Sequence, residues 1–223
     1  MLPLPPNEVH LFWSEPAADA LPALMPLLSP EEIERGNRFR FEQHRLLFRY
    51  AHGVLRTVLA RYTGDDPRAL VFEEVGNGRP ELRGRAVRFN LSHTAGLVLV
   101  GVTRDDDLGV DVEVIDSERG RDELLAARVF TPRELAAWRS EDHPNGFFDR
   151  WTLKESYMKA RGDGLSLGLR NFGFPTLAER PAIESDFGDA AEWQFLSFAP
   201  TPAHRAAAAI RATDVRWISH PSS

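Results

Sequence analysis

Two short segments of the chain hold the side chains best suited to chemistry. Asp111 and Glu113 alternate with valines, so in a strand they share one face, about 7 Å apart from a rise of roughly 3.3 Å per residue. Glu155 and Lys159 stand four positions apart, so in a helix they also share one face. Brought together, these groups can hold a divalent cation against a phosphate and place a base and an ammonium beside it. The combination predicts phosphoryl-group chemistry.

Each pair taken alone also has an ordinary structural explanation. Asp111 and Glu113 would be acceptable on a solvated strand face. Glu155 and Lys159 would make a surface ion pair worth a few tenths of a kcal/mol. The surrounding helix favours the functional interpretation, because it is apolar over much of its circumference through Trp151, Leu153, Tyr157 and Met158. A helix buried in this way does not usually carry charged side chains without partners.

Two further groups of residues are candidates for binding an anion. Ser92 and His93 are expected in a turn after a strand, where both side chains can donate hydrogen bonds to a phosphate; a neutral structural role for His93 stays open. His93 has no histidine partner at zinc-binding spacing. Arginines are dense on a predicted long helix, and one or two of them suit a phosphate, while the others are expected to be solvated or to lie over apolar surface: Arg35, Arg38, Arg40, Arg45 and Arg49.

Composition limits the class of protein. The chain has 223 residues, enough for one large domain or two small ones with a real core. With 27 basic and 33 acidic residues the net charge is -6, so no nucleic-acid partner is expected. There is no cysteine, which excludes disulfides and thiolate metal sites. No signal peptide or membrane span is recognised, so a cytoplasmic protein is expected.

The order of predicted elements indicates an α+β fold. Strands are predicted at 8–13, 70–75, 87–91, 97–102 and 108–115, and again near 172 and at 193–198, 206–211 and 215–218. One long or broken helix is predicted from Ser29 to Tyr62, and further helices begin at Thr131 and span 146–161. Two similar halves are therefore expected, each with helices packed on a mostly antiparallel sheet, meeting near residues 104–108.

The same pieces occur in a known family. The segments 89–93, 108–113 and 151–159, with 164–167 after them, resemble in sequence and order the 4'-phosphopantetheinyl transferases, specifically the single-chain, pseudo-twofold type that activates surfactin-class peptide synthetases. The resemblance covers roughly residues 29 to 170. It implies an enzyme that moves the phosphopantetheine arm of coenzyme A onto a serine of an apo acyl or peptidyl carrier protein and releases adenosine 3',5'-bisphosphate.

The resemblance also implies a role for each candidate residue. Asp111, Glu113 and Glu155 match the family's magnesium ligands, and Glu155 is also the candidate base for the incoming serine. Lys159 matches the lysine on the pyrophosphate. The residues that match contacts to the nucleotide end of coenzyme A are Arg45, Arg79, Ser92 and His93. Residues 1–105 would contribute to coenzyme A binding, residues 106–223 would carry the metal and catalytic groups, and the active site would lie at their interface.

Some expectations are less determined by the motifs. One basic position of the family is occupied here by Glu32, while Arg35 keeps the next one. The segment 130–138 corresponds to a region that meets the carrier protein in the family. One chain with two halves suggests a monomer. A non-catalytic coenzyme A or carrier-binding module and a magnesium-dependent phosphohydrolase remain as alternatives.

Overall fold

The computed structural model describes residues 1–17, 19–84 and 86–221 as a mixed α+β protein. The first sheet has the strand order β11-β1-β5-β4, and a second sheet has the order β6-β10-β9. Their strands are β1 (Glu8–Ser14), β4 (Arg88–Thr94), β5 (Leu97–Thr103), β6 (Leu108–Val114), β9 (Trp193–Phe198), β10 (His204–Arg211) and β11 (Arg216–Pro221). All pairings within these two sheets are antiparallel except β1 with β11. The predicted α+β class is confirmed.

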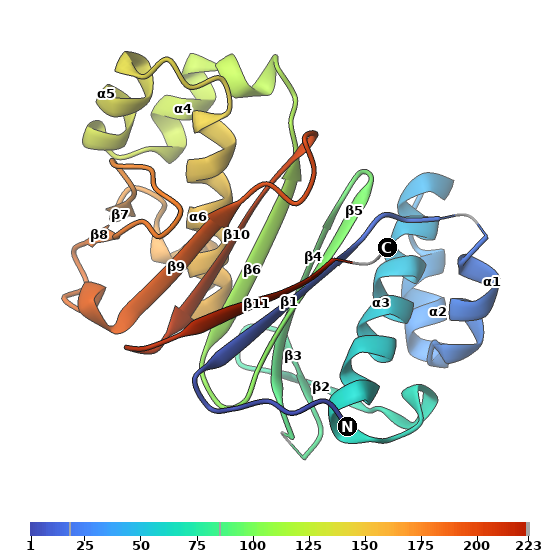
Figure 1. Ribbon diagram of the computed structural model, residues 1–223. Helices are drawn as coiled ribbons and strands as arrows, with labels where there is room; N and C mark the ends of the chain where they lie inside the picture. Colours follow the sequence, from blue (N-terminus) through green and yellow to red (C-terminus); the bar gives the residue numbers. More distant parts are fainter. Residues whose placement is uncertain (18, 85, 222–223) are drawn as a thin grey trace.

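Each sheet is covered by one long helix, and the two sheets stand next to each other (Figure 1). The helices are α1 (Leu21–Leu24), α2 (Pro30–Asn37), α3 (Glu42–Thr63), α4 (Glu123–Val129), α5 (Pro132–Ser140) and α6 (Gly146–Arg161). Helix α3 packs on the first sheet and α6 on the second, while α4 and α5 lie beyond the N-terminal end of α6. Two short hairpin ladders complete the fold: β2 (Phe72–Val75) with β3 (Arg79–Leu82), and β7 (Phe172–Gly173) with β8 (Glu184–Ser185).

The helix boundaries follow local signals in the sequence. Helix α2 begins with a capping box in which Ser29 and Glu32 satisfy each other's backbone N–H groups. The helical segment predicted from Ser29 to Tyr62 is broken, because Phe41 takes an extended backbone conformation before α3 starts. Both long helices end at a glycine in the left-handed region, Gly64 after α3 and Gly162 after α6, each with a φ of 77°.

Helix α6 is buried around most of its surface, as its composition predicts. Its Lys154 is fully buried and donates to Glu134 Oε2 at 2.7 Å and to the Phe172 carbonyl at 2.6 Å. The other carboxylate oxygen of Glu134 accepts from the backbone N–H of Phe174 at 2.8 Å. This buried pair ties α5, α6 and the segment after α6 together, which fixes the helix that carries Glu155 and Lys159.

One expectation about local structure is wrong. Ser92 and His93 lie inside strand β4, not in a turn, because β4 pairs with β5 as far as Thr94 opposite Leu97. The turn follows at Ala95–Gly96, where Gly96 has a φ of 84°. Because side chains alternate along a strand, Ser92 and His93 point to opposite faces of β4.

The two sheets meet along β4 and β6 through side chains. The acceptors Asn90 Oδ1, Ser92 Oγ and Thr94 Oγ1 receive hydrogen bonds from the backbone N–H groups of Val110, Val112 and Val114 at 2.9, 3.3 and 3.4 Å. Three alternate polar side chains therefore take the place of direct strand pairing. We call this row the polar ladder. In the described part of the chain, no helix is both long and apolar enough to cross a membrane.

Candidate active site

Helix α6 crosses strand β6 in direct backbone contact at Gly109. A Cβ atom placed on Gly109 would lie 2.1 Å from the carbonyl oxygen of Ser156 and 2.4 Å from the backbone nitrogen of Ala160. Only glycine allows an approach this close. The same point brings the Cβ atom of Lys159 within 3.0 Å of that position. The glycine before Val110 and Asp111 therefore places the C-terminal half of α6 directly over the acidic strand.

Lys159, Asp111 and Ser92 form one hydrogen-bonded group at the junction of the sheets. Lys159 Nζ donates to Asp111 Oδ1 at 2.7 Å, to Ser92 Oγ at 3.1 Å and to the Val110 carbonyl at 3.1 Å. Ser92 in turn donates to Asp111 Oδ1 at 3.0 Å. The Asp111 side chain is 7% exposed and that of Lys159 is 29% exposed, so the carboxylate is buried while part of the lysine side chain reaches solvent. The structure thus brings together side chains from β4, β6 and α6.

Glu113 is held by two groups that its sequence context does not reveal. The indole N–H of Trp151 donates to Glu113 Oε1 at 3.0 Å, and Arg119 donates to Oε2 at 3.2 Å. The Arg119 guanidinium also lies over the Trp151 ring, 5.1 Å from its centroid. Trp151 looks like one more apolar residue of a buried helix, and Arg119 belongs to no periodic pattern, so neither gives a sequence signal.

Glu155 is the most strongly perturbed acid of the group. Its pKa is raised from 4.5 to about 7, chiefly by burial and then by the negative charges of Asp111 and Glu113, against the opposing positive charges of Lys159 and Arg119. A carboxyl group with a pKa near neutrality can both accept and release a proton at physiological pH.

The donor set fits a hard cation, although it is not arranged as a ready coordination cluster. Among the described residues, no three His, Cys, Asp or Glu side chains form such a cluster, and Asp111 and Glu113 each face a basic side chain instead. However, Asp111 Oδ2 is buried and has no hydrogen-bond partner. An orphaned carboxylate oxygen beside two further acids, one of them with a raised pKa, is what a divalent cation would stabilise.

A cavity of about 280 Å³ opens next to these groups. It is lined by Glu155, Met158 and Lys159 from α6, by Asn90 and Leu91 from β4, and by the loop and strand residues 77–80. Within that segment, Arg79 donates to the carbonyls of Ala160 and Leu108, at 3.1 and 3.2 Å, and burial lowers its pKa. The β2–β3 hairpin of the first half therefore closes over the C-terminal end of α6.

The remaining predicted residues lie around this centre. His93 faces the α3 side of β4 and is partly exposed; desolvation, with the positive charges of Lys159 and of His52 when protonated, lowers its pKa. Arg45 lies in the first turn of α3, where it bonds to the Phe39 carbonyl and to Glu42, so the structure does not join it to the Lys159 group.

Glu32, at the position where the family resemblance leads one to expect a basic residue, has a structural role in this protein. Its Oε2 atom accepts from the buried Arg56 at 2.8 Å and from the backbone N–H of Ser29. This acid therefore joins α2 to α3.

Comparison with known proteins identifies the family. The chain is 39% identical to the 4'-phosphopantetheinyl transferase HetI of Nostoc sp. over 181 residues, which cover 74% of this chain and 76% of the relative. It is also similar to the transferase psf-1 of Bacillus pumilus, with 34% identity over 67% of this chain and 64% of that one, and to Sfp of Bacillus subtilis strain 168, with 29% identity over 66% of each. The family model of the 4'-phosphopantetheinyl transferase superfamily matches residues 107–210.

The chain belongs to the 4'-phosphopantetheinyl transferase superfamily. The predicted family and the prediction of an enzyme are confirmed. In this transferase the matched segment 107–210 begins just before β6 and ends in β10, so it contains Asp111, Glu113, Glu155 and Lys159. The structure adds that Ser92, from outside that segment, hydrogen-bonds to two of them, Asp111 and Lys159.

Proposed function

We propose that this protein transfers the 4'-phosphopantetheine arm of coenzyme A to a serine of an apo acyl or peptidyl carrier protein and releases adenosine 3',5'-bisphosphate. The observation that carries the proposal is the group formed by Asp111, Lys159 and Glu155 at the junction of the two sheets, in a chain of this family. Coenzyme A is a polyanion, and this net-acidic protein needs a local cationic site to bind it.

The transfer requires a base and a stabiliser of negative charge. A serine hydroxyl is a weak nucleophile at neutral pH, and Glu155, with its raised pKa, is suited to accept its proton as the oxygen attacks phosphorus. Lys159 carries the ammonium of the group and lines the cavity, so it would stabilise charge that develops on the leaving bisphosphate. Asp111, Glu113 and Glu155 would hold a magnesium ion, which when bound neutralises charge on the phosphates.

The cavity beside Glu155 is suited to the nucleotide end of coenzyme A. Arg79 and Pro80 line it together with Lys159, and His93 and Arg45 lie on the same half of the molecule, at β4 and α3. We therefore assign Arg79, Ser92, His93 and Arg45 to coenzyme A binding, with Ser92 acting through Lys159 and Asp111. Residues 1–105 would thus supply most of the nucleotide contacts and residues 106–223 the catalytic groups.

The decisive experiment weighs the carrier. The protein is incubated with coenzyme A, magnesium and several apo carrier proteins, and each carrier is analysed by mass spectrometry. A gain of one phosphopantetheine arm is expected for at least one carrier. No gain with any of them would contradict the proposal. Release of adenosine bisphosphate without a carrier would indicate a phosphohydrolase, and binding without turnover would indicate a non-catalytic module.

Substitutions test the assigned roles. Glu155→Gln and Asp111→Ala are expected to abolish turnover, at least about a thousandfold, because each removes a group acting on the reacting phosphates. Arg139→Ala is a matched control, since it breaks only an exposed ion pair with Glu123. Near-normal rates in either active-site variant would remove that residue from the mechanism.

Lys159→Ala separates binding from catalysis. If its ammonium acts mainly on developing charge, kcat should fall more than the affinity for coenzyme A. A variant with normal kcat and a raised Kd would assign Lys159 to ground-state binding instead.

Metal binding has a readout that does not depend on activity. Magnesium is expected to raise the Tm of the native protein and to have little effect on Asp111→Asn. Equal shifts in both proteins would contradict the ligand role. Because one chain contains both halves, we also propose a monomer, for which light scattering should give a mass of 25.1 kDa.

A further inference from the structure

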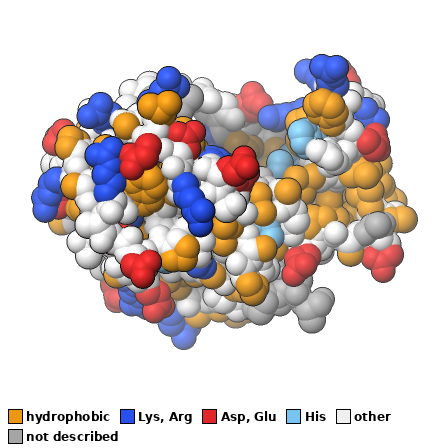
Figure 2. Space-filling model, turned by 90° about the horizontal axis from the view of Figure 1, so that it is seen from above, with side chains coloured by type: hydrophobic (Ala, Val, Ile, Leu, Met, Phe, Trp, Pro, Cys, Tyr) orange, Lys and Arg blue, Asp and Glu red, His pale blue; other side chains and the backbone are white. Residues whose placement is uncertain are grey.

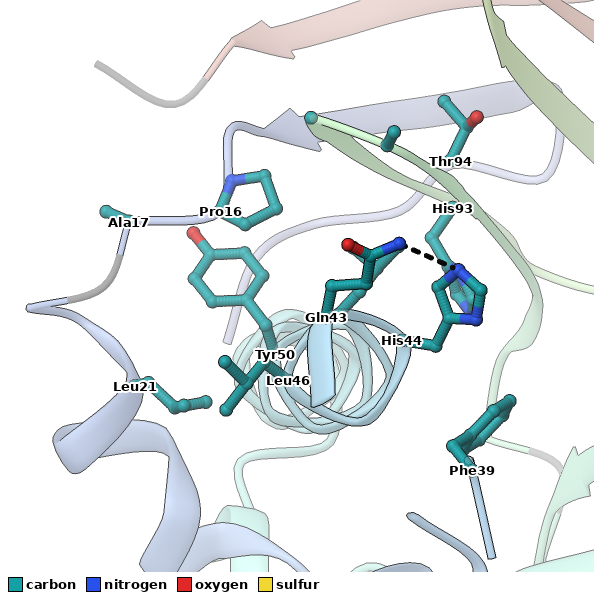
Figure 3. A pocket seen from close by; sticks show the side chains of 13 residues that line it. Pro16, Ala17, Leu21, Phe39, Gln43, His44, Leu46, Tyr50, His93 and Thr94 are labelled. Carbon is teal, nitrogen blue, oxygen red and sulfur yellow. Dashed lines mark hydrogen bonds between the residues drawn. The ribbon is translucent and has the colours of Figure 1, made fainter. Parts of the chain in front are cut away.

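A second and larger cavity lies on the first half of the protein, but it offers no charge to a diphosphate. Its volume is about 810 Å³, and no Lys, Arg, Asp or Glu is among the described residues that line it. Figure 3 shows this lining between the N-terminal end of α3 and strand β4. Seen from above, hydrophobic side chains gather beside histidines on this part of the surface (Figure 2). The cations that contact the predicted metal ligands lie instead on α6 and in the turn after β6, at Lys159 and Arg119.

These two cations differ in how fully the protein uses them. The ammonium of Lys159 has three N–H groups, and it donates to three acceptors on β4 and β6. The guanidinium of Arg119 has five N–H groups, and among the described residues it donates to Glu113 Oε2 alone, at 3.2 Å. The Arg119 side chain is also 34% exposed. Arg119 therefore keeps donors that a bound phosphate can use.

The backbone that carries Arg119 is held in place. The 3-10 turn Arg119–Arg121 follows Asp116, whose carboxylate accepts from the backbone N–H of Arg119 at 3.1 Å. Gly120 packs closely on Phe148, since a Cβ atom on this glycine would lie 3.1 Å from the ring. A change in the position of the guanidinium therefore needs only a change of side-chain rotamer.

The guanidinium lies over the face of α6 that leads to the reacting groups. It is 5.1 Å from the centroid of the Trp151 ring, and the indole N–H of Trp151 donates to the other oxygen of Glu113 at 3.0 Å. Trp151, Glu155 and Lys159 follow one another at intervals of four residues, so they share one face of α6 in steps of roughly 6 Å. Arg119 therefore lies about one step from Glu155 and two steps from Lys159.

Arg119 already fills the role of a counter-ion at Glu113. A divalent cation that binds Glu113 has to compete with this guanidinium, and the two positive groups repel each other when both remain there. The displaced guanidinium then needs another anion, and the diphosphate of coenzyme A is the anion expected at this site.

We propose that Arg119 neutralises Glu113 in the metal-free protein and turns to the diphosphate of coenzyme A once Glu113 binds a divalent cation. The inference rests on the proposed function, which assigns Glu113 to the metal and this site to coenzyme A. Arg119 thus lowers the affinity for the metal alone and raises the affinity for coenzyme A in the presence of metal.

The test measures two dissociation constants by calorimetry, without a carrier protein. One is the Kd of magnesium alone, and the other is the Kd of coenzyme A at saturating magnesium. In Arg119→Gln, which can still donate to Glu113 but carries no charge, the Kd of magnesium is expected to be about tenfold lower, because the competing cation is gone. The Kd of coenzyme A is expected to be about tenfold higher, because the diphosphate loses a charge-assisted hydrogen bond.

Two further variants separate charge from packing. Arg119→Lys keeps the charge and should hold both Kd values within about threefold of those of the native protein. Arg121→Gln changes the net charge by the same amount at an exposed position of the same turn, and both Kd values should be unchanged.

The opposite directions of the two shifts make the test decisive. If Arg119 only held Glu113 in place, Arg119→Gln would bind both ligands more weakly, and this result would overturn the inference. So would any other combination in which the two Kd values do not move in opposite directions. A native protein that binds no magnesium would contradict the assigned metal ligands and, with them, the inference. If the expected shifts are found but no carrier gains mass, the transferase proposal fails while the role of Arg119 stands.

Discussion

At the scale of single residues, the site is defined by charges that need one another. Asp111 is buried, Glu113 is held by Trp151 and Arg119, and Glu155 has a raised pKa because of its burial and the charges of the other two acids. Lys159 compensates only part of this negative charge, because it faces Asp111. Three acids with one ammonium and one guanidinium among them leave an excess of carboxylates, which indicates a site that gains stability when a cation enters.

The raised pKa of Glu155 predicts that the stability of the protein depends on pH. The folded protein holds the Glu155 proton more tightly than the unfolded chain does, so without metal the free energy of unfolding should fall as pH rises from about 4.5 to about 7. A shift of this size corresponds to at most roughly 3 kcal/mol. Urea unfolding of the metal-free protein at pH 4.5 and 7.5 measures the fall, and Glu155→Gln should show less of it by that amount. An identical pH dependence in the two proteins would show that Glu155 titrates normally.

At the scale of elements, the site depends on how closely α6 approaches β6. The contact at Gly109 leaves no room for a side chain. The polar ladder fixes the edge of β6 that faces β4, because three β4 side chains accept hydrogen bonds from the β6 backbone. Each functional side chain is therefore positioned by an element whose packing is fixed nearby. The buried Lys154–Glu134 pair holds the opposite side of α6 in the same way.

Gly109→Ala tests this close approach. The added methyl group meets backbone atoms of α6, which cannot turn aside as a side chain can, so the helix must shift. We expect a loss of about 3 kcal/mol in the free energy of unfolding and a loss of transfer activity, measured by urea titration and by the carrier mass assay. Gly36→Ala is the control, since its methyl would meet the Phe48 ring at 3.3 Å and needs only a small adjustment. Normal stability and activity of Gly109→Ala would contradict the role of this contact.

The helices and strands can be predicted from the sequence better than the contacts that join the two sheets. Helix α6 is predicted with its observed bounds, since its apolar pattern is continuous and a glycine ends it. The strand β4 is predicted too short, because Ser92, His93 and Thr94 look like turn residues and only the pairing with β5 extends them. The partners of Glu113 and the polar ladder depend on tertiary contacts between distant segments, and such contacts leave no local pattern.

At the scale of the whole molecule, the two halves are joined at several places, among them the Arg79 contacts with Ala160 and Leu108. The polar ladder joins β4 to β6, and the last strand, β11, returns to the first half and pairs with β1 in parallel from Glu8 to Trp13. Arg216 in β11 also pairs with the buried Glu8. The order β11-β1-β5-β4 puts β11 at the edge of the sheet farthest from the active site. The C-terminal strand β11 therefore lies at one edge of this sheet, and the candidate active site lies beside β4 at the opposite edge.

Truncating the chain after Val215 tests whether β11 stabilises the fold without contributing to the active site. Loss of β11 removes the ladder along β1 and leaves the Glu8 carboxylate without its guanidinium, so the free energy of unfolding should fall by about 3 kcal/mol or more. The kcat and KM measured below the lowered Tm should stay near those of the full chain, because β4, β6 and α6 are untouched. Arg211→Ala, which breaks only an exposed pair with Glu192, should change stability by less than about 1 kcal/mol. A truncated protein that is folded but inactive would mean that β11 affects the active site through the sheet. The inference that β11 contributes only to stability would then be wrong.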